Sequence, residues 1–282
     1  MGQRGIQKKA TGDWVVRYQR SPSLAETVIN FVEALPTIHG YRYKLLGWQK
    51  RLIRNLYKVD KQGKRVVRQA VCSMGRKGGK SSLASAVLVS YLCGPLAGRG
   101  QELYSVASDK EQSGLLFNIA EQIILQCPQL IDMVNIVRHQ KKIETKRGSF
   151  YKALASDSGR LHGLNPTFCC YDELAQAKSR LLYDTINTAF GSRDESLLLV
   201  ISTQNHDPSH IMSEVYDYAE KVSTGKVIDP TYYAQLYSAP QSDPIGHVKT
   251  WRKANPSLGS IRNLDELRRQ YQQPKHLSLI HI

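Results

Sequence analysis

A glycine-rich turn around residue 78 has the residue types that bind a triphosphate. Its glycines let successive backbone N–H groups point inward at phosphate oxygens, and the helix that follows adds its positive dipole. In the pattern G-x-x-x-x-G-K-[ST], Lys80 can reach the β- and γ-phosphates and the Ser81 hydroxyl can bind Mg²⁺. The turn departs from that pattern because Met74 stands where the first glycine belongs. It predicts an ATP and Mg²⁺ site formed by Gly75, Arg76, Lys77, Gly78, Gly79, Lys80, Ser81 and Ser82.

Two adjacent carboxyl groups, Asp172 and Glu173, follow an apolar run at 168–171. An acid at the end of a strand beside the phosphate loop can hold the Mg²⁺ that the loop serine also binds. A glutamate directly after it can polarise the attacking water as a general base. The alternative is a helix N-cap whose acid is favoured by the helix dipole. Another strand and helix lie between Lys80 and this pair, as expected when the phosphate-binding turn and the acids come from two separate strands of one sheet. The turn and the acidic pair together therefore favour ATP hydrolysis over a helix cap.

A third polar group, Ser202, Thr203 and Gln204, follows the apolar run at 196–201. Small hydroxyl and amide groups at the carboxyl edge of a sheet can contact the γ-phosphate and respond to its loss. The alternative is an ordinary core strand that ends in a polar turn. Because this run follows the phosphate-binding turn and the acidic pair along the chain, its position favours a role in coupling hydrolysis to motion.

Apolar runs alternate with helical patterns along the chain. Strands are expected near 68–74, 102–107, 150–155, 167–171, 196–202 and 232–237, and helices near 21–35, 41–57, 83–98, 110–126, 174–190 and 211–222. This alternation predicts an α/β fold with a mostly parallel sheet covered by helices on both faces.

The charge balance points to a polyanionic partner. The 282 residues carry 39 Lys and Arg against 24 Asp and Glu, a formal net charge of +15, concentrated in the first quarter and again at 138–152. Nucleic acid is the partner that this balance favours, and a solvated basic surface is the alternative. The five cysteines lack zinc-binding spacing, and the unpatterned set fits a reducing cytoplasm. Neither a signal peptide nor a membrane span is predicted.

Taken together, these motifs resemble the ATPase domain of the large terminase subunit of tailed bacteriophages, the motor that packages DNA into procapsids. The resemblance implies a RecA-like P-loop NTPase fold, with the loop as Walker A, Asp172–Glu173 as Walker B and residues 202–204 as the coupling motif. It extends over Trp48-Gln49, residues 104–112, residues 162–166 and residues 251–259. Members of the family often lack the first Walker A glycine.

The resemblance also assigns roles to single residues. It implies that Lys80 and Ser81 bind phosphate and Mg²⁺, that Asp172 holds the metal and that Glu173 activates water. Gln49 matches the glutamine that recognises adenine, and a surface helix position is its alternative. Arg76 matches a Walker A arginine that stabilises the γ-phosphate during transfer, with an idle surface cation as its alternative. Arg138 and Arg160 are candidates for an arginine that reaches into a neighbouring subunit's site.

By the same resemblance, the partners are double-stranded DNA, further copies in a homo-oligomeric ring, the portal protein and the small terminase subunit, in the host cytoplasm. The predicted organisation is a basic helical subregion at 1–64, an ATPase core at 65–240, a connection at 241–276 and a non-native tail at 277–282. Few acids follow Gly259, so a nuclease domain, which usually follows in the family, is not expected within this chain.

Two other classes of function are weighed against the motor. A helicase-type ATPase also combines an Asp-Glu pair with a Ser-Thr motif, but it needs a second ATPase-like domain, and too few residues follow Gln204 to form one. A nucleic-acid-binding module with a degenerate nucleotide site is not an enzyme. The intact set of Lys80, Ser81, Asp172 and Glu173 argues against that third class.

Overall fold

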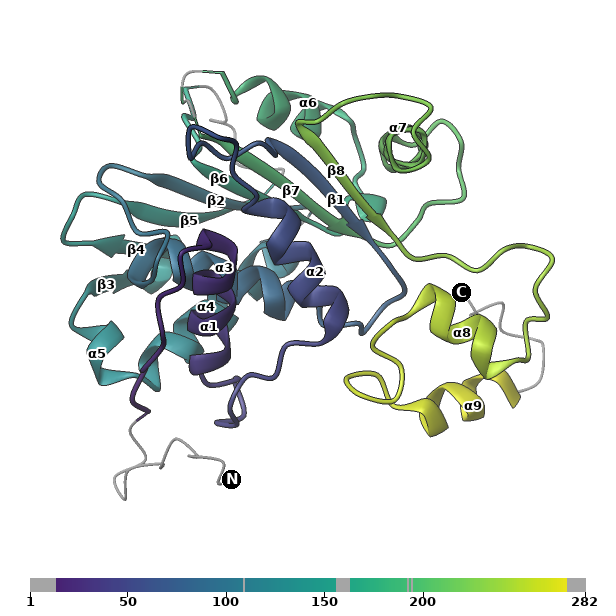
Figure 1. The fold of residues 1–282 in the computed structure, drawn as a ribbon, viewed down its shortest axis with the longest axis horizontal. Coiled ribbons are helices and arrows are strands. Elements are labelled where there is room, and N and C mark those ends of the chain that lie inside the picture. Colours follow the sequence, from purple (N-terminus) through teal and green to yellow (C-terminus); the bar gives the residue numbers. More distant parts are fainter. Residues whose placement is uncertain (1–13, 109, 156–162, 192, 194, 273–282) are drawn as a thin grey trace.

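The fold is built on one eight-stranded sheet in the strand order β3-β4-β5-β2-β6-β7-β1-β8 (Figure 1). The computed structural model describes residues 14–108, 110–155, 163–191, 193 and 195–272. The strands are β1 (Gln69–Ser73), β2 (Glu102–Ala107), β3 (Val134–Val137), β4 (Lys142–Thr145), β5 (Phe150–Ala155), β6 (Phe168–Asp172), β7 (Leu197–Ser202) and β8 (Tyr232–Leu236). From β5 to β8 every neighbouring pair is parallel, whereas β3 pairs with β4, and β4 with β5, in antiparallel fashion.

The central strands are buried on both faces, which explains why they read as continuous apolar runs in the sequence. All residues of β6 and β7 are buried. Alternate residues of these strands enter two separate apolar clusters, so Cys170 and Leu199 belong to one and Cys169 and Leu198 to the other. The sheet therefore has a helical layer on each side.

Helices α1 to α4 cover one face of the sheet, and α6 and α7 cover the other (Figure 1). Their bounds are α1 (Leu24–Ala34), α2 (Gly47–Leu56), α3 (Lys80–Cys93), α4 (Lys110–Leu125), α6 (Leu181–Thr188) and α7 (Ile211–Ser223). The short α5 (Pro128–Ile131) and the 3₁₀ turns η1 (Arg138–Gln140) and η2 (Leu174–Gln176) lie in connections. The predicted α/β fold with a mostly parallel, doubly covered sheet is confirmed. The helix expected at 174–190 is instead divided into η2 and α6.

The strands β3 and β4 and the helices α8 (Val248–Ala254) and α9 (Leu264–Gln272) were not predicted from the sequence pattern. The two helices pack around a small core of Trp251, Leu258 and Leu267. Figure 1 shows this α8–α9 unit beside the turn that joins β1 to α3. Within the described residues, none of the helices is both long enough and apolar enough to span a membrane.

Candidate functional site

The glycine-rich turn joins β1 to α3, and its conformation depends on two of its glycines. Gly79 is the N-cap of α3 with a φ of 87°, in the left-handed region that favours glycine. A Cβ at Gly78 would lie 2.6 Å from the Sδ of Met74. Met74 is buried, with 2% of its surface exposed. The residue that replaces the first glycine of the motif therefore packs against Gly78, directly before the second glycine of the motif, Gly79.

Lys80 is the first residue of α3 and lies inside the turn. Its Nζ donates to the carbonyl oxygens of Met74 at 3.0 Å and Gly75 at 3.4 Å, and the side chain is buried. Burial lowers the pKa of the ammonium, while the negative charge of Glu173 acts in the opposite direction. The ammonium is thus held beside the loop by weak neutral acceptors, which phosphate oxygens can replace with a gain in charge pairing.

Ser81 and Asp172 are brought together from different elements. The Ser81 Oγ donates to Oδ2 of Asp172 at 2.9 Å, across the gap between α3 and the end of β6. Asp172 is 7% exposed, and burial raises its pKa to about 6, with the Ser81 hydrogen bond opposing that shift. A hydroxyl and a carboxylate at this separation are hard oxygen ligands of the kind that Mg²⁺ prefers. The described residues contain no cluster of three or more His, Cys, Asp and Glu side chains that could hold a metal by themselves.

Glu173 is joined to the end of the neighbouring strand β7. Its Oε1 accepts hydrogen bonds from both the backbone N–H of Thr203, at 2.9 Å, and the Thr203 hydroxyl. Its backbone adopts a φ of 56°, and its own N–H donates to the Ile201 carbonyl at 2.8 Å. Ser202 is bonded in the same region, since its Oγ accepts from the N–H of Ala175 at 2.9 Å. The predicted base and the predicted coupling motif therefore form one hydrogen-bonded unit.

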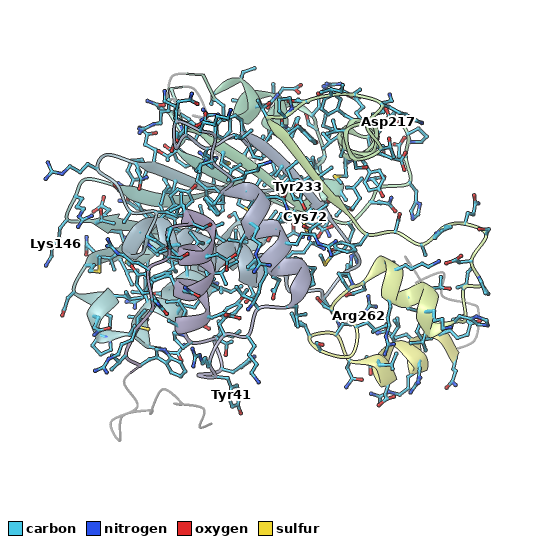
Figure 2. The ribbon with its side chains drawn as sticks, in the orientation of Figure 1. Tyr41, Cys72, Lys146, Asp217, Tyr233 and Arg262 are labelled. Carbon is cyan, nitrogen blue, oxygen red and sulfur yellow. The ribbon has the colours of Figure 1, made fainter. Side chains whose placement is uncertain are left out.

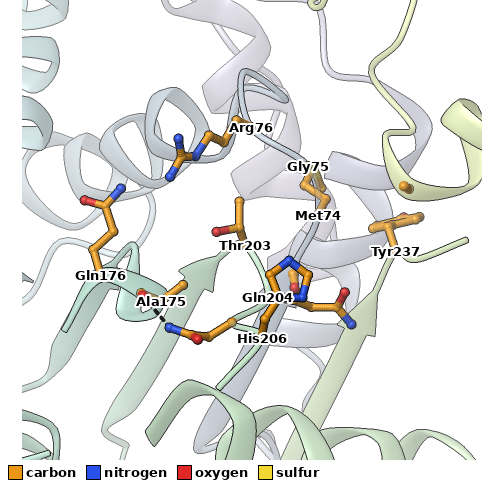
Figure 3. A pocket seen from close by; sticks show the side chains of 12 residues that line it. Met74, Gly75, Arg76, Ala175, Gln176, Thr203, Gln204, His206 and Tyr237 are labelled. Carbon is orange, nitrogen blue, oxygen red and sulfur yellow. Dashed lines mark hydrogen bonds between the residues drawn. The ribbon is translucent and has the colours of Figure 1, made fainter. Parts of the chain in front are cut away.

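Two cavities adjoin the turn. One, of about 370 Å³, is lined by Arg76, Lys77, Gly78, Gly79, Lys80, Ser81, Ser82, Gln112, Leu115, Asp172, Glu173 and Gln176. The other, of about 200 Å³, lies at the ends of β1, β7 and β8 and includes Gln204, His206 and Tyr237 (Figure 3). Arg76 and Gln176 line both cavities, and Figure 3 shows their side chains directed toward one another. The first cavity collects almost all the residues that the sequence predicted for the nucleotide.

The other predicted residues are Gln49, Arg138 and Arg160. Gln49 is buried beside the turn, where its Oε1 accepts from the N–H of Leu46 at 2.8 Å at the start of α2. Arg138 forms an ion pair with Glu121 at 2.5 Å next to β3. Since β3 is the outermost strand on that side of the sheet, Arg138 is far from the turn of its own chain. Arg160 lies outside the described residues.

Several residues at the site had no role assigned from the sequence. The Tyr43 hydroxyl is 2.6 Å from the Oγ of Ser82, and Gln112 is hydrogen-bonded to Gln176 in the larger cavity. Others belong to the α8–α9 unit, of which Asn255 and Ser257 contact the turn. Three of these residues lie in stretches that carry the family resemblance, namely Gln112, Asn255 and Ser257. The resemblance was therefore the signal in the sequence that could have identified them as site residues.

Comparison with known proteins agrees with this geometry. The family model described as "Terminase large subunit, ATPase domain" matches residues 47–221. The large terminase subunit of Enterobacteria phage HK97 is 33% identical over 204 residues, which are 71% of this chain and 40% of that protein. The matched residues therefore cover less than half the length of that curated relative.

Solved structures point the same way. The crystal structure of the HK97 large terminase superposes with a TM-score of 0.79 at 30% identity, covering 87% of this chain and 50% of that one. The large terminase of a thermophilic bacteriophage in complex with ADP gives a TM-score of 0.52 at 12% identity, over 81% of this chain and 50% of that one, a likeness of fold alone. The predicted family is thereby confirmed, and the chain belongs to the ATPase-domain family of large terminase subunits.

Proposed function

We propose that this chain is an ATP-hydrolysing motor domain that moves double-stranded DNA into a viral procapsid. The observation that carries the proposal is the pair of contacts made by neighbouring acids at one sheet edge. Asp172 accepts from Ser81, and Glu173 accepts from Thr203. This arrangement separates the two carboxyl groups into a metal-binding role and a water-activating role.

Residues of the turn bind and orient the triphosphate. The N–H groups of residues 76–81 and the N-terminus of α3 stabilise the phosphate charge, and Lys80 exchanges its two carbonyl acceptors for phosphate oxygens. Ser81 and Asp172 would hold Mg²⁺, which would neutralise part of the charge of the phosphates. The raised pKa of Asp172 supports this assignment, because a bound cation favours the ionised carboxylate.

Glu173 acts as the general base. It accepts a proton from the attacking water at a carboxylate oxygen, while Arg76 stabilises the charge of the transferred phosphoryl group. Thr203 holds that carboxylate and also lines the neighbouring cavity. A change in the phosphates at the turn is thereby transmitted to the end of β7. Gln49, beside the turn on the α2 side, is assigned to the adenine edge because its amide can both donate and accept.

The wider assembly follows from the family and the charge. A net charge of +15 supports double-stranded DNA as the polyanionic partner. The solved relative bound to ADP supports nucleotide binding at this fold. A homo-oligomeric ring, the portal protein and the small terminase subunit complete the proposed assembly, in the host cytoplasm. In such a ring, Arg138 and Arg160 remain candidates for an arginine that acts on a neighbour's site.

Glu173→Gln tests this proposal. The amide keeps the size of the side chain but cannot accept the proton, so DNA-stimulated ATP turnover should fall by roughly 10²–10⁴-fold. ATP binding, measured by calorimetry with and without Mg²⁺, should remain. The exposed Glu220→Gln is the matched control. Turnover by Glu173→Gln that equals that of the parent protein would refute the assignment.

A further inference from the structure

The α8–α9 unit is bonded directly to the backbone of the phosphate-binding turn. The N–H of Gly75 donates to the carbonyl of Ala254 at 3.0 Å. The carbonyl of Arg76 accepts from Nδ2 of Asn255 at 3.3 Å and from Nη1 of Arg262 at 3.2 Å. These contacts join residues that are 179 or 186 positions apart in the sequence. Figure 2 labels Arg262 on the side of the unit nearest the turn.

A second contact between the α8–α9 unit and the turn consists of two consecutive hydrogen bonds. Their donors and acceptors are fixed, because an indole N–H can only donate and a carbonyl can only accept. The indole Nε1 of Trp48 donates to the Oγ of Ser257 at 2.9 Å, and that hydroxyl donates its single proton to the carbonyl of Gly78 at 2.7 Å. Ser257 is fully buried and Asn255 is 2% exposed. Such consecutive bonds polarise one another and are costly to leave half made. They connect the start of α2, the turn and the α8–α9 unit.

The geometry of a phosphate-binding turn explains why these donors matter. When successive N–H groups point inward at an anion, the carbonyl groups of the same peptides must point outward. Outward carbonyls that are buried need donors of their own. At Arg76 and Gly78 those donors come from Asn255, Arg262 and Ser257.

We propose that Asn255, Ser257 and Arg262 are positioning residues of the nucleotide site. Ser257 holds the peptide of Gly78 so that the turn presents its N–H groups to the phosphates. Asn255 and Arg262 hold the peptide of Arg76 and so set where its side chain acts. This inference rests on the proposed ATP hydrolysis at the same site and goes beyond it by adding the α8–α9 unit to the site.

The two sets of contacts should have different kinetic effects, which a purely structural role would not produce. Ser257→Ala should raise the Kd for ADP about tenfold, because the phosphate-binding peptides lose their support. Asn255→Ala and Arg262→Ala should lower kcat at least fivefold with the Kd changed less than twofold. Arg262→Lys keeps a donor and should recover part of that loss. The exposed Ser260→Ala and Arg252→Ala are the matched controls, with both constants expected to equal those of the parent protein.

A double-mutant cycle with Arg76→Ala gives the decisive comparison. If Asn255 acts through Arg76, Asn255→Ala should lower kcat no further once Arg76 has been replaced. The inference would be overturned if Asn255→Ala lowered kcat by the same factor in the Arg76→Ala protein as in the parent protein. It would also be overturned if the Ser257→Ala protein bound ADP with the Kd of the parent protein. Arg262 is half-buried and its variants should fold, so the Arg262→Ala and Arg262→Lys pair decides the matter if a buried variant does not fold. A parent protein that hydrolyses no ATP would instead refute the proposed function.

Discussion

Asp172→Asn should stabilise the protein while it removes the predicted metal ligand. Asp172 is 7% exposed, and burial raises its pKa to about 6 from an ordinary value of 3.8. A difference of that size is worth roughly 3 kcal/mol at neutral pH. Because the pKa is higher in the folded state, the folded state binds this proton more tightly than the unfolded state does. The associated stability is present below about pH 4 and is lost as the pH rises through about 6.

Asparagine carries no charge at any of these pH values, and its side-chain oxygen can still accept from Ser81. Without Mg²⁺ at pH 8, Asp172→Asn should therefore raise the free energy of unfolding by ~1–3 kcal/mol and Tm by roughly 2–10 °C. Near pH 4 the gain should shrink below about 1 kcal/mol, because the parent carboxyl is then protonated in the folded state. Addition of Mg²⁺ with ATP should stabilise the parent protein much more than the variant.

Thermal and urea unfolding followed by circular dichroism at pH 4 and pH 8 would measure these changes. Asp217 is exposed, so Asp217→Asn is the matched control and should change stability by no more than about 0.5 kcal/mol. The reasoning fails if Asp172→Asn is no more stable than the parent at pH 8. It fails equally if the gain is the same at both pH values.

Two further variants test the contacts of the turn and of the base. Thr203→Val removes the hydroxyl donor to Glu173 and leaves the backbone donor, so kcat for ATP should fall by roughly 10-fold or more with ATP affinity unchanged. Steady-state kinetics measures this, Thr203→Ser should retain most of the activity, and an unaltered kcat in the valine variant would contradict the role. Gly78→Ala places a Cβ against Met74 and should cost about 1–3 kcal/mol of stability, which denaturant unfolding measures. In the Met74→Ala background the same Gly78→Ala change should cost much less, because the clashing sulfur is gone. An equal cost of Gly78→Ala in both backgrounds would refute this account of the turn.

Much of the sheet could be predicted because its signals are local. Fully buried parallel strands such as β6 and β7 require continuous apolar runs, and those runs are visible in the sequence. The strands β3 and β4 lie at the opposite extreme. In each of them three of four residues are only partly buried, and polar residues interrupt the apolar ones, so neither strand forms a continuous apolar run.

The α8–α9 unit was missed for a related reason. Within α9 only Leu267 is buried, so the helix has hardly any apolar face to reveal it. Its small core depends on Trp251 and Leu258, which come from another helix and a loop. When several short segments each contribute one residue to a core, none of them shows a periodic pattern of apolar residues from which a helix could be predicted.

The sequence by itself determined which chemistry the site can perform. Glycines followed by Lys80 and Ser81 specify a phosphate-binding turn, and acids directly after an apolar strand must lie at the carboxyl edge of a parallel sheet. Only the tertiary structure decided how these groups are paired. The bonds from Ser81 to Asp172, from Thr203 to Glu173 and from Ser257 to Gly78 depend on strand order and on how the chain folds back. Contacts between residues so far apart are selected by packing, which no local pattern encodes.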